Sequence, residues 1–335
     1  MIEKITRVVV TGGAGFIGSH LVNQLLLLGF QVIVIDNLIS GKKSHLNLNT
    51  ENLSFVEIDI RSSEIVDYFH DVDIVFHLAA LADIIPSISA PFEYMDVNVM
   101  GTTRVLEASR RAGVKKFIYA ASSSCYGIPD EFPTKETSPS DPQYPYALSK
   151  YLGEQVFFHW LKLYGLSGLS LRFFNVYGPR ARTSGNYGAV LGVFLGQKRA
   201  NLPLTIVGDG NQVRDFTYVS DVVDALILAG ISEESGIAIN IGTSNPTSVN
   251  RLAQLIGGET VHIPKRPGEP DQTNADNSLA LDILKWSAKV SIEEGVARVL
   301  SQPESWSDAP SWTPEEIAHQ TANWFKYLST GGVQD

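Results

Sequence analysis

The sequence contains very little cysteine, which limits the chemistry available to stabilise it. Cys125 is the only cysteine among 335 residues, so an internal disulfide is excluded. The seven histidines show neither HExxH spacing nor clustering with cysteine. We therefore expect no metal site.

Long apolar runs are also lacking. No run approaches the roughly 18 to 20 apolar residues that span a bilayer. Residues 1–7 lack the apolar core and cleavage site of a signal peptide. We expect a cytoplasmic protein with no membrane partner.

Basic residues are outnumbered, with 26 Lys and Arg against 36 Asp and Glu and a formal net charge of −10. This balance argues against a nucleic-acid partner. The negative net charge is compatible with an anionic small substrate if several arginines lie together at the binding site. A hydrophobic share of 44% and a charged share of 19% are typical of a globular protein, and the length suffices for two lobes.

Short β-branched runs alternate with longer helical patterns through the first half of the chain. The expected strands span Ile5–Val10, Gln31–Ile35, Leu53–Ile58, Asp73–Leu78, Lys116–Ala121 and Gly168–Phe173. The expected helices span Gly15–Leu28, Pro91–Ala112 and Tyr146–Leu163. This alternation predicts an α/β fold with a doubly wound parallel sheet.

After Asn175 the pattern becomes irregular, which indicates a smaller α/β lobe over the C-terminal edge of the sheet. Helical segments are expected near Val222–Ala229, Asn250, Ile292 and Pro314. Thr313 is expected to cap the last helix, with Pro314 in its first turn and Glu316 three residues after the cap.

The stretch VTGGAGFIGSH, residues 10–20, places Gly12, Gly15 and Gly18 between the first strand and the first helix. Glycines at this spacing allow a tight turn, close approach to a pyrophosphate and close helix packing. Asp36 ends the second strand, where its carboxylate would accept hydrogen bonds from an adenosine ribose and repel a 2′-phosphate. The pattern predicts NAD in preference to NADP; the alternative is a glycine-rich turn without a ligand.

Two further segments suit the same cofactor. Asp59 and Ile60 suit the edge of the adenine, and the small residues in Leu78–Ala80 suit the space beneath the cofactor. Each segment alone could equally serve packing.

The heptapeptide YPYALSK, residues 144–150, supplies a candidate for the chemistry. Tyr146 and Lys150 are four residues apart on an expected helix, so both project from one face. A nearby ammonium and a cationic nicotinamide would favour the phenolate and bring the pKa of Tyr146 toward the working pH. Tyr146 is therefore a candidate general base; the alternative is a surface pair on an amphipathic helix.

Ser122, Ser123 and Ser124 follow the fifth strand, at the edge where an open α/β sheet places its ligands. A serine hydroxyl there could share a proton with Tyr146 and a substrate oxygen.

These motifs and several others form one pattern. They are TGGAGFIG at 11–18, HLAA at 77–80, Asn98 with Gly101 and Thr102, SSSCYG at 122–127, YPYALSK at 144–150, RFFNVYGPR at 172–180, GDGNQVRDFTYVSD at 208–221 and RPGE at 266–269. Over nearly its whole length the chain resembles the extended short-chain dehydrogenases/reductases, in the family of sugar-nucleotide epimerases and dehydratases. The resemblance is to bacterial UDP-sugar 4-epimerases.

The resemblance implies a Rossmann-type sheet that binds NAD and a smaller C-terminal lobe that binds substrate. It makes Tyr146 the catalytic base, Lys150 the residue that holds the nicotinamide ribose, and Ser122 the catalytic hydroxyl, with Ser123 and Ser124 as helpers. The implied cofactor-binding residues are Gly12, Gly15, Phe16, Ile17, Gly18, Asp36, Asn37, Asp59, Ile60, Leu78, Ala79, Ala80, Asn98, Tyr146, Lys150 and Phe173.

For the substrate, the resemblance assigns Asn175, Arg214 and Arg266 to the phosphates of a nucleoside diphosphate and Glu269 to its ribose. It adds Val190, Leu191, Thr205 and Val207 to the nucleoside pocket. Arg180 and Arg182 are ambiguous between ligand contacts and solvated charges.

The reaction is inferred mainly from missing carboxylates. Relatives that catalyse 4,6-dehydration usually carry Asp-Glu directly after the catalytic hydroxyl, and those that decarboxylate carry Glu close by. Ser123 and Ser124 occupy those positions here. This favours a UDP-sugar 4-epimerase that oxidises C4 transiently; a dehydratase, a decarboxylase and a non-catalytic NAD-binding regulator are the alternatives.

The sugar itself is left open among hexose, N-acetylhexosamine and uronic acid types. Ala82 stands where galactose epimerases often have lysine, which favours the N-acetylhexosamine and uronic acid types. Thr273 aligns with a residue that limits the space near the C2 substituent, so a small side chain there leaves room for an N-acetyl group. The alternative is that Thr273 lies outside the pocket.

The expected domains are an NAD-binding domain, residues 1–172 with a returning segment at about 213–240, and a nucleotide-sugar domain, residues 173–212 and 241–330. Residues 331–335 are expected to be a frayed tail. A homodimer is expected through Pro91–Ala112 and Tyr146–Leu163, which carry apolar residues beyond one core stripe: Val97, Val105, Leu152, Val156 and Leu163. Simple burial against the sheet is the alternative.

Overall fold

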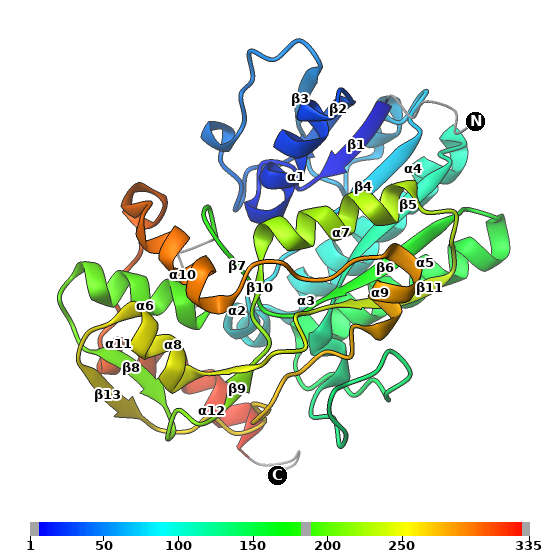
Figure 1. The fold of residues 1–335 in the computed structure, drawn as a ribbon. Helices are drawn as coiled ribbons and strands as arrows, with labels where there is room; N and C mark the ends of the chain where they lie inside the picture. The colour runs from blue at the N-terminus through cyan, green and yellow to red at the C-terminus, as the bar shows by residue number, and fades with distance from the viewer. Residues whose placement is uncertain (1–6, 182–188, 330–335) are drawn as a thin grey trace.

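A parallel sheet of seven strands forms the centre of the protein, in a computed structural model that describes residues 7–181 and 189–329 (Figure 1). The strand order is β11-β6-β5-β4-β1-β2-β3. The strands are β1 (Arg7–Thr11), β2 (Gln31–Asp36), β3 (Leu53–Glu57), β4 (Ile74–His77), β5 (Lys116–Ser122), β6 (Gly168–Phe173) and β11 (Ile237–Ile241). The predicted doubly wound sheet is confirmed, and its order reverses between β1 and β4, where open α/β sheets bind ligands.

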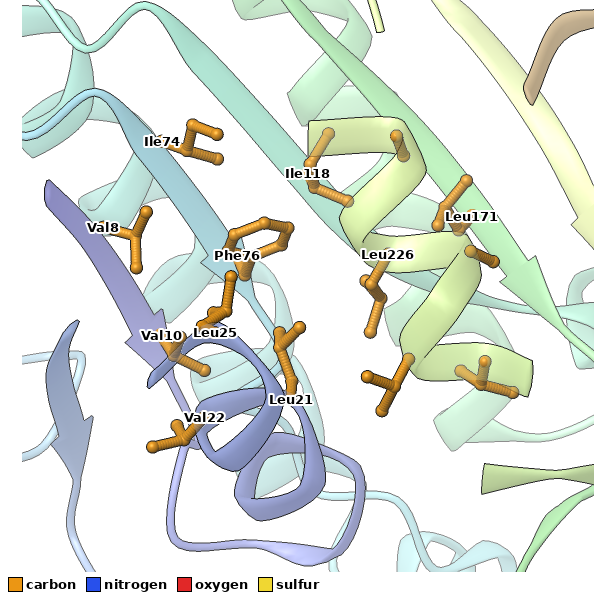
Figure 2. Packing of buried hydrophobic residues seen from close by; sticks show 14 of the residues in the cluster. Val8, Val10, Leu21, Val22, Leu25, Ile74, Phe76, Ile118, Leu171 and Leu226 are labelled. Carbon is orange, nitrogen blue, oxygen red and sulfur yellow. The ribbon is translucent and has the colours of Figure 1, made fainter. Parts of the chain in front are cut away.

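One face of the sheet is covered by α1 (Phe16–Leu27) and α7 (Val219–Ile231), which pack side by side. Figure 2 shows Leu21 and Leu25 of α1 and Leu226 of α7 against Phe76 and other apolar side chains of the strands. Helix α9 (Ser278–Leu284) returns from the second half of the chain and completes this layer beside β11.

The opposite face is covered by α4 (Thr102–Ala112), α5 (Pro145–Tyr164) and the 3₁₀ segment η2 (Ser63–Tyr68). Phe117 and Tyr119 of β5 are fully buried under Phe157 of α5, and the rings of Tyr119 and Phe157 are stacked 5.8 Å apart. This aromatic contact fixes the height of α5 above the sheet.

The helix expected over Pro91–Ala112 is interrupted. It consists of α3 (Pro91–Met95), a π-helical segment η3 (Asp96–Gly101) and α4. A π turn inserts one extra residue per turn and is frequent at functional sites. Asn98 lies within it, and its side chain bonds two other segments described below.

The segments η3, α4 and α5 do not expose all the apolar residues that were expected to lie beyond the core. Val97 and Val105 are buried in the core against the sheet, which corrects the expectation that they extend beyond it, and Val156 packs against the same core. The exposed apolar side chains of this region are Phe92, Met100, Leu148, Leu152 and Leu163.

The second lobe contains the remaining helices and short strand pairs. Its helices are α6 (Val190–Arg199), α8 (Val249–Ile256), α10 (Ile292–Leu300), α11 (Pro314–Gln320) and α12 (Ala322–Leu328), with the 3₁₀ segment η5 (Pro303–Trp306). The strand pairs are β8 (Leu204–Val207) with β13 (Thr260–Ile263), β7 (Val176–Tyr177) with β10 (Thr217–Tyr218), and β9 (Val213–Arg214) with β12 (Thr247–Ser248). Short elements near the active site are α2 (Ile84–Ser89) and two 3₁₀ segments, η1 (Lys43–His45) and η4 (Ser123–Tyr126).

The end of the chain forms the predicted cap. Thr313 accepts from the Glu316 amide while Glu316 accepts from the Thr313 amide, so both bonds of a capping box are present. Residues 330–335, which include the tail expected to fray, lie outside the described residues. In residues 7–181 and 189–329, no helix is long and apolar enough to cross a membrane.

Candidate active site

The turn between β1 and α1 brings three backbone segments too close together for any side chain. Gly12 has φ +71°, and a Cβ there would lie 2.7 Å from the Ala79 amide nitrogen. A Cβ on Gly18 would lie 2.1 Å from the Gly12 carbonyl oxygen. Helix α1 begins directly after Gly15, so its first amides face the turn. Such an exposed helix N-terminus is suited to a pyrophosphate.

The carboxylate of Asp36 is fixed beside this turn. One oxygen accepts from the Ala14 amide at 3.0 Å and the other from the Leu38 amide at 2.8 Å. Burial raises the pKa of Asp36, and the two amides oppose that rise by stabilising the charged form. The acidic residue is therefore preorganised next to the glycine turn, as a ribose acceptor requires.

Asn37 and Asp59 lie together at the ends of β2 and β3. The Asn37 amide donates to Asp59 at 2.8 Å, and Arg61 donates to both Asp59 oxygens. These bonds, that from Arg61 foremost, lower the pKa of Asp59 to about 2. Arg61 also reaches Asp96 at 2.8 Å, which ties this corner to η3. Sequence reasoning missed Arg61 because its partners come from separate elements.

A buried histidine lies behind Leu78–Ala80. The Thr102 hydroxyl donates its single proton to the Asn98 carbonyl at 2.6 Å, so it accepts from Nε2 of His77 at 2.9 Å. Nδ1 of His77 then accepts from the Thr11 hydroxyl at 2.7 Å. Burial lowers the pKa of His77 to about 3, which keeps the ring neutral.

Asn98 connects the loop after β4 with α5. Its side chain donates to the Leu81 carbonyl and accepts from the Leu81 amide, at 2.9 and 2.8 Å, and donates to the Ser149 hydroxyl at 2.8 Å. Ser149 lies between Tyr146 and Lys150, so Asn98 fixes the height of the loop relative to both. In this structure the predicted cofactor residue Asn98 therefore acts as a structural bridge.

The three candidate catalytic side chains come from the end of β5 and the start of α5. The Ser122 hydroxyl lies 2.8 Å from the Ser124 hydroxyl and acts to lower the pKa of Tyr146. The Ser124 amide donates to Ser122, and Ser123 begins η4 directly after it. The Lys150 ammonium lies 4.5 Å from the centre of the Tyr119 ring.

The protonation states differ from the sequence expectation. Burial raises the pKa of Tyr146, and the hydrogen bond from Ser122 only partly opposes this. Burial also lowers the pKa of Lys150 to about 7. In the chain alone burial therefore sets the direction of the Tyr146 pKa, and the lowering expected from Lys150 together with a bound nicotinamide stays a prediction.

The charge of a carboxylate that sequence reasoning missed acts on Tyr146. Asp83 precedes α2, and its negative charge raises the pKa of Tyr146. The loop that carries it is fixed two residues earlier, where Asn98 bonds Leu81. No local pattern marks this position, because Asp83 and Tyr146 are far apart in the sequence.

The second lobe gathers two arginines around one glutamate. Arg214 contacts Glu269 at 2.9 Å, and Arg266 lies 3.6 Å from the other oxygen of the same carboxylate. Arg214 and Arg266 are also largely buried, with side-chain exposures of 10% and 12%. Three of the four residues predicted to bind the phosphates and ribose therefore form one cluster.

Asn175 and Thr273 lie beside this cluster. The Thr273 hydroxyl donates to Asn175 at 3.1 Å and accepts from the Asp215 amide at 3.2 Å. Asp215 is fully buried, and its carboxylate accepts from the amides of Thr243, Ser244 and Ala275. Asp215, which was not among the predicted site residues, thus fixes the loop that carries Thr273.

One of the four predicted nucleoside residues lines a pocket at the end of β8. Val207 lines this pocket together with Arg214, Glu269 and Lys265. Thr205 is buried and its hydroxyl accepts from Gln197 at 2.8 Å, while Leu191 packs in the lobe core with Val190 against it. Only Val207 of the four lines the pocket, and the roles of the others stay predictions.

The structure describes only one of the two arginines whose role the sequence left open. Arg180 donates to the Ser19 hydroxyl at 3.1 Å and so joins the second lobe to α1. Arg182 lies outside the described residues.

The comparisons with known proteins agree with this geometry. The family model described as NAD dependent epimerase/dehydratase family matches residues 8–242. This chain belongs to that family. A putative UDP-glucose 4-epimerase of Methanocaldococcus jannaschii is 38% identical, over 88% of this chain and 97% of that protein.

Two solved structures illustrate the likeness of fold. The UDP-glucose 4-epimerase of Thermotoga maritima, solved with UDP-glucose, has a TM-score of 0.84 and 38% identity, over 88% of this chain and 98% of its own. The UDP-N-acetylglucosamine 4-epimerase of Methanobrevibacter ruminantium, solved with UDP-N-acetylmuramic acid, has a TM-score of 0.84 and 34% identity, over 90% and 100%.

The cofactor of this epimerase/dehydratase family is NAD, and the residues present fit it. The glycine turn leaves the space that a Cβ would fill, the α1 amides suit the pyrophosphate, and Asp36 offers a fixed carboxylate to the ribose. Asn37, Asp59 and Ile60 lie at the neighbouring strand ends, and Leu78–Ala80 and Phe173 lie at the ends of β4 and β6. The assignments of individual residues stay predictions.

The carboxylate of Asp36 predicts a strong preference for NAD over NADP, because it cannot satisfy a 2′-phosphate and repels it. Asp36→Asn keeps the shape and removes the charge, so the ratio of the two dissociation constants should shrink at least about tenfold. Titration calorimetry measures both constants. Equal affinities of the unaltered protein for NAD and NADP would contradict the assignment.

Proposed function

We propose that this protein is an NAD-dependent 4-epimerase of a UDP-sugar. The observation that supports this most is the constellation of Ser122, Tyr146 and Lys150 beside the NAD cradle. The positions after Ser122 hold Ser123 and Ser124, without the carboxylates that dehydration or decarboxylation would use. Inversion at C4 requires only a base, a hydroxyl and a redox cofactor.

The roles of the side chains follow from their positions. Tyr146 removes the proton from the C4 hydroxyl as a general base and later returns it. Ser122, whose hydroxyl acts to lower the pKa of Tyr146, shares its proton with the same oxygen. Bound NAD supplies the oxidation and reduction at C4. Its positive charge and that of Lys150 favour the phenolate that burial alone disfavours.

The diphosphate is assigned to Arg214 and Arg266. Glu269 contacts Arg214 at 2.9 Å and lies 3.6 Å from Arg266, which keeps the two guanidinium groups together. Arginine binds phosphate through two parallel hydrogen bonds. This local cluster explains how a chain of net charge −10 would bind an anionic nucleotide.

Two side chains, Thr273 and Asp83, favour one class of sugar over another. Thr273 is small and is held next to Asn175, which supports its assignment as the residue that leaves room for an N-acetyl group. The Asp83 charge beside Tyr146 disfavours a second carboxylate at C5. We therefore propose a neutral hexose or N-acetylhexosamine as the sugar, in preference to a uronic acid.

The proposed assembly is a homodimer through the segments Pro91–Ala112 and Tyr146–Leu163, which include α3, η3, α4 and most of α5. Phe92 and Met100 are 83% and 55% exposed, and Leu148, Leu152 and Leu163 of α5 are exposed as well. Exposed apolar side chains concentrated on adjacent helices are typical of an interface.

The reaction is tested by incubating the protein with UDP-glucose, UDP-N-acetylglucosamine and UDP-glucuronic acid. NMR and mass spectrometry should show the C4 epimer of the first two at unchanged mass, and UDP-glucuronic acid should be the poorest of the three substrates. Tyr146→Phe should still bind NAD and lose at least about a hundredfold in kcat. Loss of water or carbon dioxide from the substrate would replace this function with the alternatives.

The sugar pocket is tested with Thr273→Tyr. The larger ring should lower kcat/KM for the N-acetylated substrate at least about tenfold more than for UDP-glucose, because it fills the space near C2. Thr273→Ser is the matched control, since it keeps the hydroxyl that bonds Asn175. Equal losses for both substrates would remove Thr273 from the pocket.

The assembly is tested by light scattering at micromolar concentration. The unaltered protein should have twice the chain mass of 36.6 kDa. Leu152→Arg with Met100→Arg should give the monomer, whereas Leu281→Arg, on the exposed side of α9, should not. A monomeric unaltered protein would exclude the dimer.

A further inference from the structure

A buried ion pair lies beneath the catalytic side chains, outside the cofactor and substrate sites described above. Glu154 of α5 and Arg172 of β6 have side-chain exposures of only 1% and 7%. Nε and Nη2 of Arg172 donate to the two oxygens of Glu154 at 3.0 and 2.7 Å. The Ser170 hydroxyl donates to the same carboxylate at 2.6 Å.

Glu154 lies one helical turn beyond Lys150, which lies one turn beyond Tyr146. The spacing of four residues places all three on one row of α5. The Lys150 ammonium rests on the Tyr119 ring, and the Tyr119 phenol donates to the Lys150 carbonyl at 3.1 Å. Lys150 is thus held against an aromatic face, while the carboxylate of Glu154 is held by β6.

The described part of this core contains further titratable groups besides Glu154. Burial keeps three of them neutral: it raises the pKa of Tyr119, raises that of Cys125 to about 12 and lowers that of His77 to about 3. Arg172 is positive, and the charge of Asp83 acts on Tyr146. At Lys150 itself, burial lowers the pKa and Glu154 raises it.

Stability alone does not explain the pair. Buried ion pairs often contribute little net stability, because desolvation offsets their attraction. Glu154 and Lys150 are four residues apart on α5, a spacing at which oppositely charged side chains can pair directly. The bonds from Arg172 and Ser170 occupy the carboxylate and prevent this.

We propose that Glu154 is a positioning residue that keeps Lys150 protonated from a distance, and that Arg172 restrains Glu154 so that the two do not pair directly. The proposal rests on the proposed function for the role of Lys150. It assigns the ion pair a task in tuning the reaction, separate from binding either ligand.

Glu154→Gln tests this directly, since glutamine keeps the shape and removes the charge. Without the nearby negative charge, the ammonium form of Lys150 is less stable, so its pKa should fall by about one unit. NMR of protein labelled with ¹³C at the lysine Cε measures this pKa, with the signal assigned by its loss in Lys150→Met. This readout does not depend on turnover, so it remains valid if the proposed function fails.

The kinetic consequence has a definite direction. Protonated Lys150 is lost as pH rises, so the alkaline limb of the kcat profile should move to lower pH in Glu154→Gln. Arg172→Gln removes the positive charge that offsets the charge of Glu154, so Glu154 should stabilise the Lys150 ammonium more strongly. The alkaline limb of the kcat profile should then move to higher pH. A merely structural pair would lower kcat by a similar factor at every pH.

The double variant Glu154→Gln with Arg172→Gln guards against poor folding of either single variant, because it leaves no unpaired buried charge. Its Lys150 pKa should lie below that of the unaltered protein but above that of Glu154→Gln. A Lys150 pKa that is the same in the unaltered protein, Glu154→Gln and the double variant would overturn the proposal.

Discussion

The active site depends on how firmly α5 is held against the sheet, because this helix carries both Tyr146 and Lys150. Phe157 stacks on Tyr119, and Glu154 is bonded to Arg172 of β6. Asn98 adds a third attachment through Ser149. Together these contacts fix the base relative to Ser122 at the end of β5, where a shift of 1 Å can cost about a hundredfold in rate.

Burial opposes the protonation states that the proposed reaction uses. It favours neutral Tyr146 and neutral Lys150, as the directions of both pKa shifts show. The reaction requires phenolate and ammonium instead. In our proposal, the charge of Glu154 favours the ammonium of Lys150 and the positive charge of bound NAD favours the phenolate of Tyr146. The second lobe contributes a comparable constraint, since buried Asp215 fixes the loop with Thr273 beside Arg214.

Short sequence patterns predicted those elements and motifs that are determined by residues close together in the sequence. The alternation of strands and helices, the glycine turn and the four-residue spacing of Tyr146 and Lys150 all lie within short segments. The π turn at Asn98 was not predictable, since it follows from bonds to Leu81 and Ser149 on other elements. Asp83 was missed for the same reason: its neighbour Tyr146 is distant in sequence. The Tyr146 pKa was expected to fall because a sequence shows the adjacent charge and not the desolvation.

The fate of the hydrogen at C4 is the most direct test of the account. A UDP-sugar labelled with deuterium at C4 is incubated with the protein in ordinary water, and both epimers are analysed by NMR and mass spectrometry. Transient oxidation at C4 within a closed site predicts that the deuterium remains at C4 in both epimers, without exchange into solvent. Loss of the deuterium to water, or its retention with the sugar unchanged in configuration, would contradict the account.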